Sequence, residues 1–127
     1  MLMSFVITLD VNNPELMINF WSNILCYELD SSDQFKDPEQ VYWYLVDPAD
    51  KGTRLLIQQV PEPVTAKSRM HIDVHLDDIE IEVAAKRAID MGAKRIDPTP
   101  MTEFGATWIR MLDPEGNHFC FVLNREK

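Results

Sequence analysis

The sequence has little of three things: cysteine, long apolar runs and positive charge. Its two cysteines, Cys26 and Cys120, are too few for a disulfide framework and suit a reducing compartment. No apolar run is long enough to span a bilayer, and residues 1–10 lack the basic stretch with which a signal peptide begins. These absences predict a cytoplasmic protein that has no membrane partner.

Positive charge is scarce, since the sequence has 12 Lys and Arg residues against 21 Asp and Glu residues. The formal net charge is therefore −9. Such a chain repels nucleic acid and attracts cations, so no nucleic-acid partner is expected. The simplest interpretation of the charge is solubility. With 127 residues, of which 46% are hydrophobic, the chain can bury one core, and a single domain over 1–127 is expected.

The first half of the chain predicts a strand, a helix and further strands. Apolar and polar residues alternate over 5–11, which is typical of a strand with one face against a core. Asn13 and Pro14 then resemble the N-cap and first position of a helix. The remaining expected elements of this module, residues 1–60, are strands over 41–46 and 54–60 joined by a turn over 47–52.

A connector over 61–69 contains two prolines and no periodicity, and a second module over 70–127 follows it. Alternation predicts a strand over 70–76. Asp77 and Asp78 are expected to cap a helix that runs to Met91 and is closed by Gly92. The other expected elements are strands over 94–96, 107–112 and 118–123, with a proline-containing loop after the first of them and a turn over 113–117.

The two halves repeat each other. An offset of 65 residues lays 5–9 on 70–74, and the last strands pair when 56–60 is laid on 118–122. Two copies are too few for a solenoid, so they should close on each other. The sequence therefore predicts an α+β fold of two βαβββ modules with curved mixed sheets. One helix covers one face of each sheet, and the other faces are expected to enclose a shared cavity.

These features resemble the vicinal oxygen chelate superfamily, which includes glyoxalases, bleomycin-resistance proteins and dioxygenases. The resemblance rests on the two modules, on His71 within 69–74 and on the closing hairpin 112–117. The stretch 60–63, which leads toward the His71 strand, and the ending 113–120 are most similar to the glyoxalase-like branch. The resemblance implies this fold and a homodimer, but no particular reaction, since the superfamily holds several.

The resemblance also implies where a metal would bind, namely at Val6, Gln58, His71 and Cys120. Valine cannot coordinate an ion and a glutamine amide is a weak ligand, so no metal or other cofactor is expected. His71, Gln58 and Cys120 are the candidates if a metal does bind. Strand alternation turns these side chains toward the cavity, whose expected lining is Val6, Thr8, Gln58, His71, Asp73, Trp108, Arg110 and Cys120.

Each of these residues has more than one interpretation. His71 is a remnant ligand or a general base, or a histidine that simply pairs with Asp73. Cys120 is a thiolate nucleophile or ligand, or a buried inert thiol, which is the commoner case. Gln58 suits a hydrogen bond to a substrate better than a metal. Trp43, Tyr44, Trp108 and Arg110 lie on central strands, so only some of them can face the cavity.

The function predicted from the sequence is binding of a small organic molecule, with catalytic residues and reaction unassigned. One alternative is a metal-dependent lyase, isomerase or ring-cleaving dioxygenase that uses His71, although the carboxylate and the second histidine of such sites are missing. Another is sequestration of a cationic antibiotic, suggested by the net charge and the aromatic strands. The sequence leaves open whether the modules pair within one chain and whether residues 31–40 form a lid.

Overall fold

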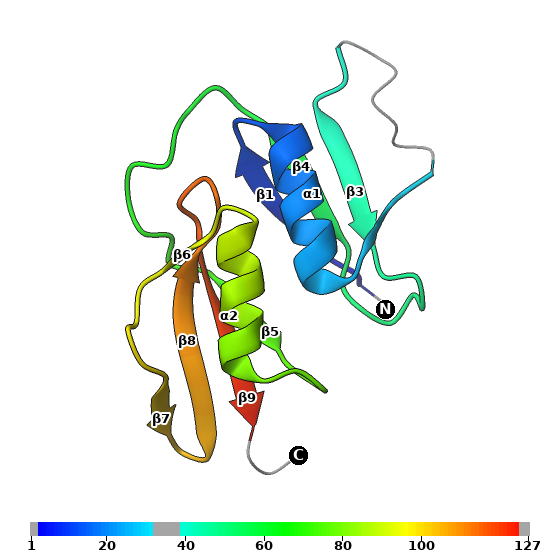
Figure 1. Ribbon diagram of the computed structural model, residues 1–127. Coiled ribbons are helices and arrows are strands. Elements are labelled where there is room, and N and C mark those ends of the chain that lie inside the picture. Colours follow the sequence, from blue (N-terminus) through cyan, green and yellow to red (C-terminus); the bar gives the residue numbers. More distant parts are fainter. Residues whose placement is uncertain (1–2, 32–38, 125–127) are drawn as a thin grey trace. The chain divides into compact units, whose positions relative to one another are not determined.

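The computed structural model describes residues 3–31 and 39–124, without the side chain of Asn124. Most of the stretch considered as a lid, residues 31–40, therefore lies outside the described residues. The chain divides into two units, Met1–Pro63 and Val64–Lys127, and their boundary falls inside the expected connector 61–69 (Figure 1). Each unit is described by itself, so the shared cavity stays a prediction.

Unit 1 is a βαβββ module with one sheet. Its strands follow the order β1-β4-β3-β2, in which β1 runs parallel to β4 and the other neighbours are antiparallel. The parallel pair is possible because the helix carries the chain back between them. The elements are β1 (Ile7–Val11), α1 (Pro14–Leu25), β2 (Glu28–Leu29), β3 (Tyr42–Val46) and β4 (Leu55–Gln59).

The helix of unit 1 begins where the sequence predicted. The Asn13 side chain accepts a hydrogen bond from the Leu16 N–H at 3.1 Å, and Pro14 opens the first turn. Figure 1 shows α1 lying across β1 and β4. Burial of the apolar side of the helix against one sheet face stabilises the unit. The side chains that form this core are Val11, Met17, Ile18, Phe20, Trp21, Trp43, Leu45, Leu55 and Ile57.

Unit 2 repeats the plan with one extra strand. Its sheet has the order β5-β9-β8-β6, with β5 parallel to β9, and β7 also pairs with β8. The elements are β5 (Ile72–His75), α2 (Ile81–Asp90), β6 (Lys94–Arg95), β7 (Met101–Glu103), β8 (Ala106–Leu112) and β9 (His118–Asn124). The core on the helix side consists of Val74, Leu76, Ile81, Ala84, Ala85, Ala88, Ile109, Met111, Phe119 and Phe121.

The structure differs from the sequence-based expectation at two short strands and one helix start. Neither β2 nor β7 was predicted, because two or three residues are too few to show a period, and every residue of β7 is exposed. The N-cap of α2 is Glu80 and not Asp77 or Asp78, and its side chain makes no cap hydrogen bond. The helix end was predicted correctly, since Gly92 follows it with φ of 104°.

The α+β class with two βαβββ units is thus confirmed. Among the described residues, no helix has the length and apolar character needed to cross a membrane.

Candidate functional site

The candidate site lies on the face of the second sheet that is turned away from α2, which we call the distal face of unit 2. Alternation places the side chains of every second residue there, because their neighbours are buried on the helix side. Within the ladder, Asp73 lies opposite Cys120, and Cys120 lies opposite Arg110. The residues of this face on β5, β9 and β8, together with the residue that precedes β5, are His71, Asp73, His75, Trp108, Arg110, Leu112, His118, Cys120 and Val122.

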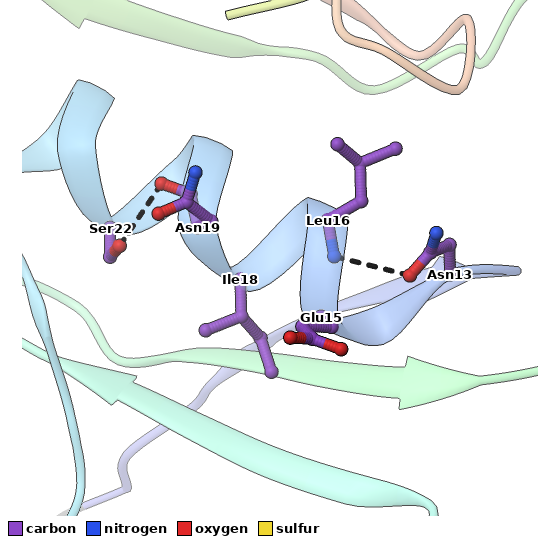
Figure 2. A pocket seen from close by; sticks show the side chains of 6 residues that line it. All are labelled: Asn13, Glu15, Leu16, Ile18, Asn19 and Ser22. Atoms are coloured by element: carbon purple, nitrogen blue, oxygen red, sulfur yellow. Dashed lines mark hydrogen bonds between the residues drawn. The ribbon is translucent and has the colours of Figure 1, made fainter.

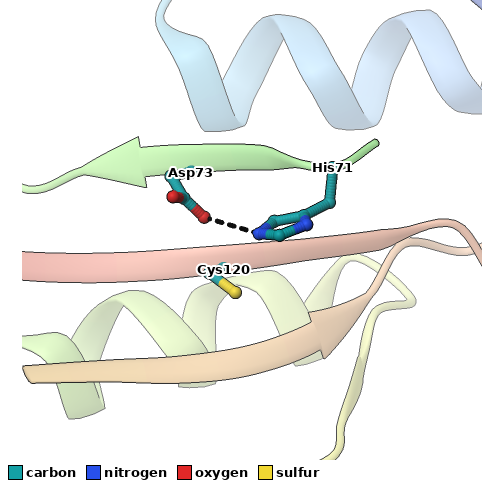
Figure 3. Close-up of side chains that lie close together, drawn as sticks. All are labelled: His71, Asp73 and Cys120. Carbon is teal, nitrogen blue, oxygen red and sulfur yellow. Dashed lines mark ion pairs between the residues drawn. The ribbon is translucent and has the colours of Figure 1, made fainter. Parts of the chain in front are cut away.

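Three of these side chains converge (Figure 3). Nε2 of His71 is 3.0 Å from Oδ1 of Asp73, and one ligand atom each from His71, Asp73 and Cys120 all lie within 4.8 Å of one another. The His71 and Asp73 side chains are 42% and 49% exposed, whereas Cys120 is buried. The structure therefore places His71 beside Cys120, as alternation predicted, and shows the expected alternative in which His71 pairs with Asp73.

The thiol of Cys120 is held in its protonated form. Burial is the main cause, followed by the negative charge of Asp73 and the hydrogen bond between these side chains, and together they raise the pKa of Cys120 to about 11. A thiolate nucleophile at neutral pH would need the opposite shift. The geometry favours the interpretation of Cys120 as an inert thiol unless a cation displaces its proton.

Arg110 is fixed on the distal face by a buried carboxylate. Strands β6 and β7 pair with the same edge of β8 and leave a gap between them, where Asp97 lies. Its Oδ2 accepts the Arg110 backbone N–H at 2.9 Å, and its Oδ1 accepts Nη2 of Arg110 at 2.7 Å. These hydrogen bonds hold the pKa of Asp97 below its usual range. The Arg110 side chain stays 47% exposed, whereas that of Asp97 is 6% exposed.

Asp97 and His118 were absent from the predicted cavity lining. Asp97 follows a two-residue strand inside a proline-containing loop, so no periodicity marks it. His118 shares the distal face by alternation, and from the sequence it was a possible neighbour that could lower the pKa of Cys120. Burial is the main cause of a lowered pKa at His118, with smaller contributions from Lys67, Arg110 and His71.

Unit 1 does not bring its predicted site residues together. Val6 precedes β1 and is 40% exposed, and Gln58 pairs with Asp10, four residues further along. At about 3.3 Å per residue this separates the two positions by roughly 13 Å along the strand, too far for one ion. Thr8 does lie on the distal face of this unit, and Nε2 of Gln58 is 3.5 Å from the Tyr42 hydroxyl.

The ladders also correct the alignment of the two modules. Thr8 lies opposite Leu56 in unit 1, and Asp73, its counterpart in the repeat, lies opposite Cys120 in unit 2. The structural counterpart of Cys120 is therefore Leu56 and not Gln58, so the sequence alignment of the last strands was wrong by two residues. A leucine can no more bind a metal than the valine at position 6.

The aromatic residues of the central strands divide between the two faces, as their alternation requires. Trp43 is 3% exposed and lies opposite Ile57 in the core of unit 1, so it lines no distal surface. Tyr44 faces the other way and carries the guanidinium of Arg54 above its ring, 4.2 Å from the centroid. Trp108 lies on the distal face of unit 2, opposite Val122.

A surface depression of about 550 Å³ lies along α1 (Figure 2). It is lined by Asn13, Glu15, Leu16, Ile18, Asn19 and Ser22. Its polar groups serve the helix itself, because Asn13 caps Leu16 and the Asn19 carbonyl accepts a hydrogen bond from Ser22 Oγ at 3.2 Å. Glu15 is the ionisable residue of this lining, and it has no second catalytic or metal-ligating side chain beside it there, so the depression is a weaker candidate than the distal face.

A family model described as a glyoxalase-like domain matches residues 6–122. The chain belongs to this family. The match spans both units and includes His71 and Cys120, although Val6 and Gln58 show that membership alone does not supply a complete ligand set. No curated protein matches the sequence.

Solved structures similar to this glyoxalase-like chain share its fold at low sequence identity. A glyoxalase/bleomycin resistance protein/dioxygenase family enzyme from Burkholderia phytofirmans PsJN is 17% identical with a TM-score of 0.74, covering 94% of this chain and 96% of its own. The fosfomycin resistance protein FosX from Mesorhizobium loti is 16% identical with a TM-score of 0.71, covering 98% and 94%. FosX from Listeria monocytogenes, complexed with Mn(II) and sulfate ion, is 17% identical with a TM-score of 0.74, covering 98% and 92%.

The residues present fit a metal only in part. The first module offers no ligand at Val6 or Leu56, and Gln58 lies too far from Val6 to share an ion with it. Unit 2, in contrast, offers an imidazole, a carboxylate and a thiol within 4.8 Å. This donor set suits zinc better than a hard cation such as magnesium. A metal would therefore be held by His71, Asp73 and Cys120.

Proposed function

We propose that this glyoxalase-like protein binds a small organic molecule on the distal face of unit 2. The observation that supports the proposal is the convergence of His71, Asp73 and Cys120 beside the fixed guanidinium of Arg110. Ligand sites combine apolar and aromatic surface with a few polar groups that point to one place. Trp108, which is partly exposed, supplies aromatic surface on the same face.

The chemistry of the site supports binding and proton transfer more than nucleophilic attack. The pKa of about 11 keeps Cys120 protonated. The Asp73 carboxylate, 3.0 Å from Nε2, would fix the orientation of the His71 ring, so that Nδ1 could take a proton from a bound molecule. The similar structures include fosfomycin resistance proteins, which is in keeping with a small organic ligand without naming the one bound here.

A thermal-shift screen with small carboxylates, phosphonates, amines and neutral aromatic compounds tests this function. A compound that binds should raise the melting temperature of the native protein, because binding to the folded state alone stabilises it. The shift should shrink in His71→Ala and persist in Asn19→Ala, a matched control in the depression of Figure 2. A shift lost in Asn19→Ala but kept in His71→Ala would move the site to α1 and contradict the proposal.

A second candidate function is metal-assisted chemistry at His71, Asp73 and Cys120, favoured by the 4.8 Å cluster. Bound zinc would polarise a substrate oxygen or activate water. Zinc should then raise the melting temperature of the native protein and of Gln58→Ala, but not of Cys120→Ser. The absence of metal predicted from the sequence remains untested. Unchanged melting of the native protein with zinc, nickel and iron would remove this candidate.

We also propose that the protein is a homodimer. The first strands, β1 and β5, each end the path of their own sheet, and an edge strand is a surface that a second chain can protect. Large apolar side chains near these strands are exposed, with Phe5 at 76% and Met70 at 79%. Sedimentation should give twice the chain mass. A monomer whose mass is independent of concentration would overturn the proposal.

A further inference from the structure

The strongest unassigned feature of the distal face of unit 2 is the guanidinium of Arg110. The chain carries a net charge of −9, yet the Arg110 side chain is 47% exposed on this face. The acidic groups at this place are Asp73, which pairs with His71, and Asp97, which pairs with Arg110. Both carboxylates are already paired, so a ligand that reaches this face meets the half-exposed guanidinium of Arg110.

Part of the Arg110 guanidinium remains exposed although the side chain is paired with Asp97. Asp97 accepts hydrogen bonds from Nε, at 3.1 Å and 3.0 Å to its two oxygens, and from Nη2 at 2.7 Å. Nη1 of Arg110 takes no part in these hydrogen bonds. Because Asp97 is itself fixed by the Arg110 backbone N–H and Nε of Arg95 donates to its carbonyl at 2.6 Å, the guanidinium has little freedom to turn away.

The network behind Arg110 extends across the edge of the sheet to the helix. Arg95 forms a two-point ion pair with Glu82 of α2, with Nη1 to Oε2 at 2.6 Å and Nη2 to Oε1 at 3.1 Å. The chain of contacts runs from Glu82 through Arg95 and the Asp97 segment to Arg110. A guanidinium anchored in this way loses less conformational entropy on ligand binding than a free surface arginine does.

We propose that the ligand of this face carries an anionic group, a carboxylate or a phosphonate, which Arg110 binds beside His118. The inference rests on the proposed function and adds the chemical class of the ligand. A planar guanidinium presents its donors to such oxygens in a fixed geometry, and charge-assisted hydrogen bonds of this kind are strong. The cationic antibiotic considered from the sequence fits this site poorly, because its charge would meet the guanidinium of Arg110.

Backbone amide NMR titrations with acetate, methylphosphonate, acetamide and tetramethylammonium at constant ionic strength test the proposal. Acetate or methylphosphonate should give saturable shifts at residues 108–112 and 118–122, and the stronger of the two identifies the anion. Arg110→Gln should weaken that binding by about tenfold or more, as expected for loss of a hydrogen bond to a charged group. Arg54→Gln is the matched control, because Arg54 is 45% exposed and also paired with an aspartate.

Arg110→Gln leaves the buried Asp97 without its cationic side-chain partner, so the double variant Asp97→Asn/Arg110→Gln provides the same test without an unpaired charge. Equal anion binding by this variant and the native protein would overturn the inference, as would saturable binding of tetramethylammonium alone or of no probe. If a neutral compound from the thermal-shift screen binds the distal face while neither anion does, the proposed function stands and the anionic class fails.

Discussion

The two units share one topology but carry different chemistry on their distal faces. In unit 1 the equivalent row across β1, β4 and β3 reads Thr8, Leu56 and Tyr44, which cannot form an ion pair with one another. In unit 2 the corresponding strands, β5, β9 and β8, bring together Asp73, Cys120 and Arg110. Asp73 forms an ion pair with His71, and Arg110 forms one with Asp97. Repetition of a fold therefore preserves the backbone ladder and the core while the face away from the helix is free to diverge.

The hairpin turns show what the repeat does preserve. Asp47 accepts backbone hydrogen bonds from Ala49, Lys51 and Gly52, and Asp113 accepts them from Glu115 and Asn117. Both turns begin with Asp-Pro and need the carboxylate to satisfy their backbone donors. The difference between the units thus lies in what the distal faces bind and not in how the sheets are built.

The largest effect is expected when the buried carboxylate that fixes Arg110 is removed and compared with its counterpart in unit 1. Asp97→Ala should lower the free energy of unfolding by about 2–3 kcal/mol, because an arginine and a backbone N–H lose their partner. Asp30→Ala, which removes the partner of Arg54, should cost less than about 1 kcal/mol, since that pair is exposed. Urea unfolding measures both, and equal losses would show that the Asp97 network is not special.

Acid should act on the same network. The hydrogen bonds from Arg110 hold the pKa of Asp97 below its unfolded value, so the unfolded state binds the proton more readily. The resulting stability is present above a pH of about 3.8 and is lost as the pH falls through the lower folded pKa. Asp97→Asn should therefore unfold with a shallower dependence on pH below 4 than the native protein, whereas an unchanged slope would show that other carboxyls dominate.

Loss of the hairpin aspartate should also cost more stability in unit 2 than in unit 1, but by a smaller difference than for Asp97 and Asp30. Asp113 is 1% exposed, and Asp113→Ala should cost about 1–3 kcal/mol, because buried backbone donors lose their acceptor. Asp47 lies in a more solvent-exposed turn, where water can replace the carboxylate, so Asp47→Ala should lower the melting temperature less. Thermal unfolding of the two variants gives the comparison. A larger loss for Asp47→Ala would mean that the hairpin of unit 1 is the more important one for the fold.

The smallest effect on stability is expected at the residue most closely tied to function. The His71 and Asp73 side chains are both more than two fifths exposed, so His71→Ala should cost less than about 1 kcal/mol and shift the melting temperature by less than about 4 °C. Ligand binding should weaken in the same variant. A drop of about 4 °C or more would make His71 structural and leave the distal face without an identified functional residue.

The fold was predictable because its signals are local and repeated. Alternation in the strands, the Asn13 cap and Gly92 after α2 each report burial or backbone geometry at one place in the chain. The exposed strand β7 and the two-residue β2 bury too little to produce a pattern. They form because β8 and β3 offer them free edges, which is a property of the folded sheet.

The site was predictable only in part, because only some of its features follow from local sequence patterns. Alternation correctly placed His71, Asp73 and Cys120 on one face, because that depends on parity alone. The register between neighbouring strands cannot be obtained from parity. For this reason Gln58 was matched to Cys120, although Leu56 is the residue at the equivalent position. The role of Asp97 depends on a gap between two short strands, which no pattern within the sequence reveals.

The central claim is that ligand binding belongs to the distal face of unit 2, and mapping a binding compound by backbone amide NMR tests it most directly. The compound should be the one that gives the largest shift of melting temperature in the screen. The account predicts that perturbed amides cluster at residues 71–75, 108–112 and 118–122, and that His71→Ala reduces the perturbation. Perturbations centred on the distal face of unit 1, at residues 8–10, 42–44 and 56–58, or on the depression along α1, would contradict it.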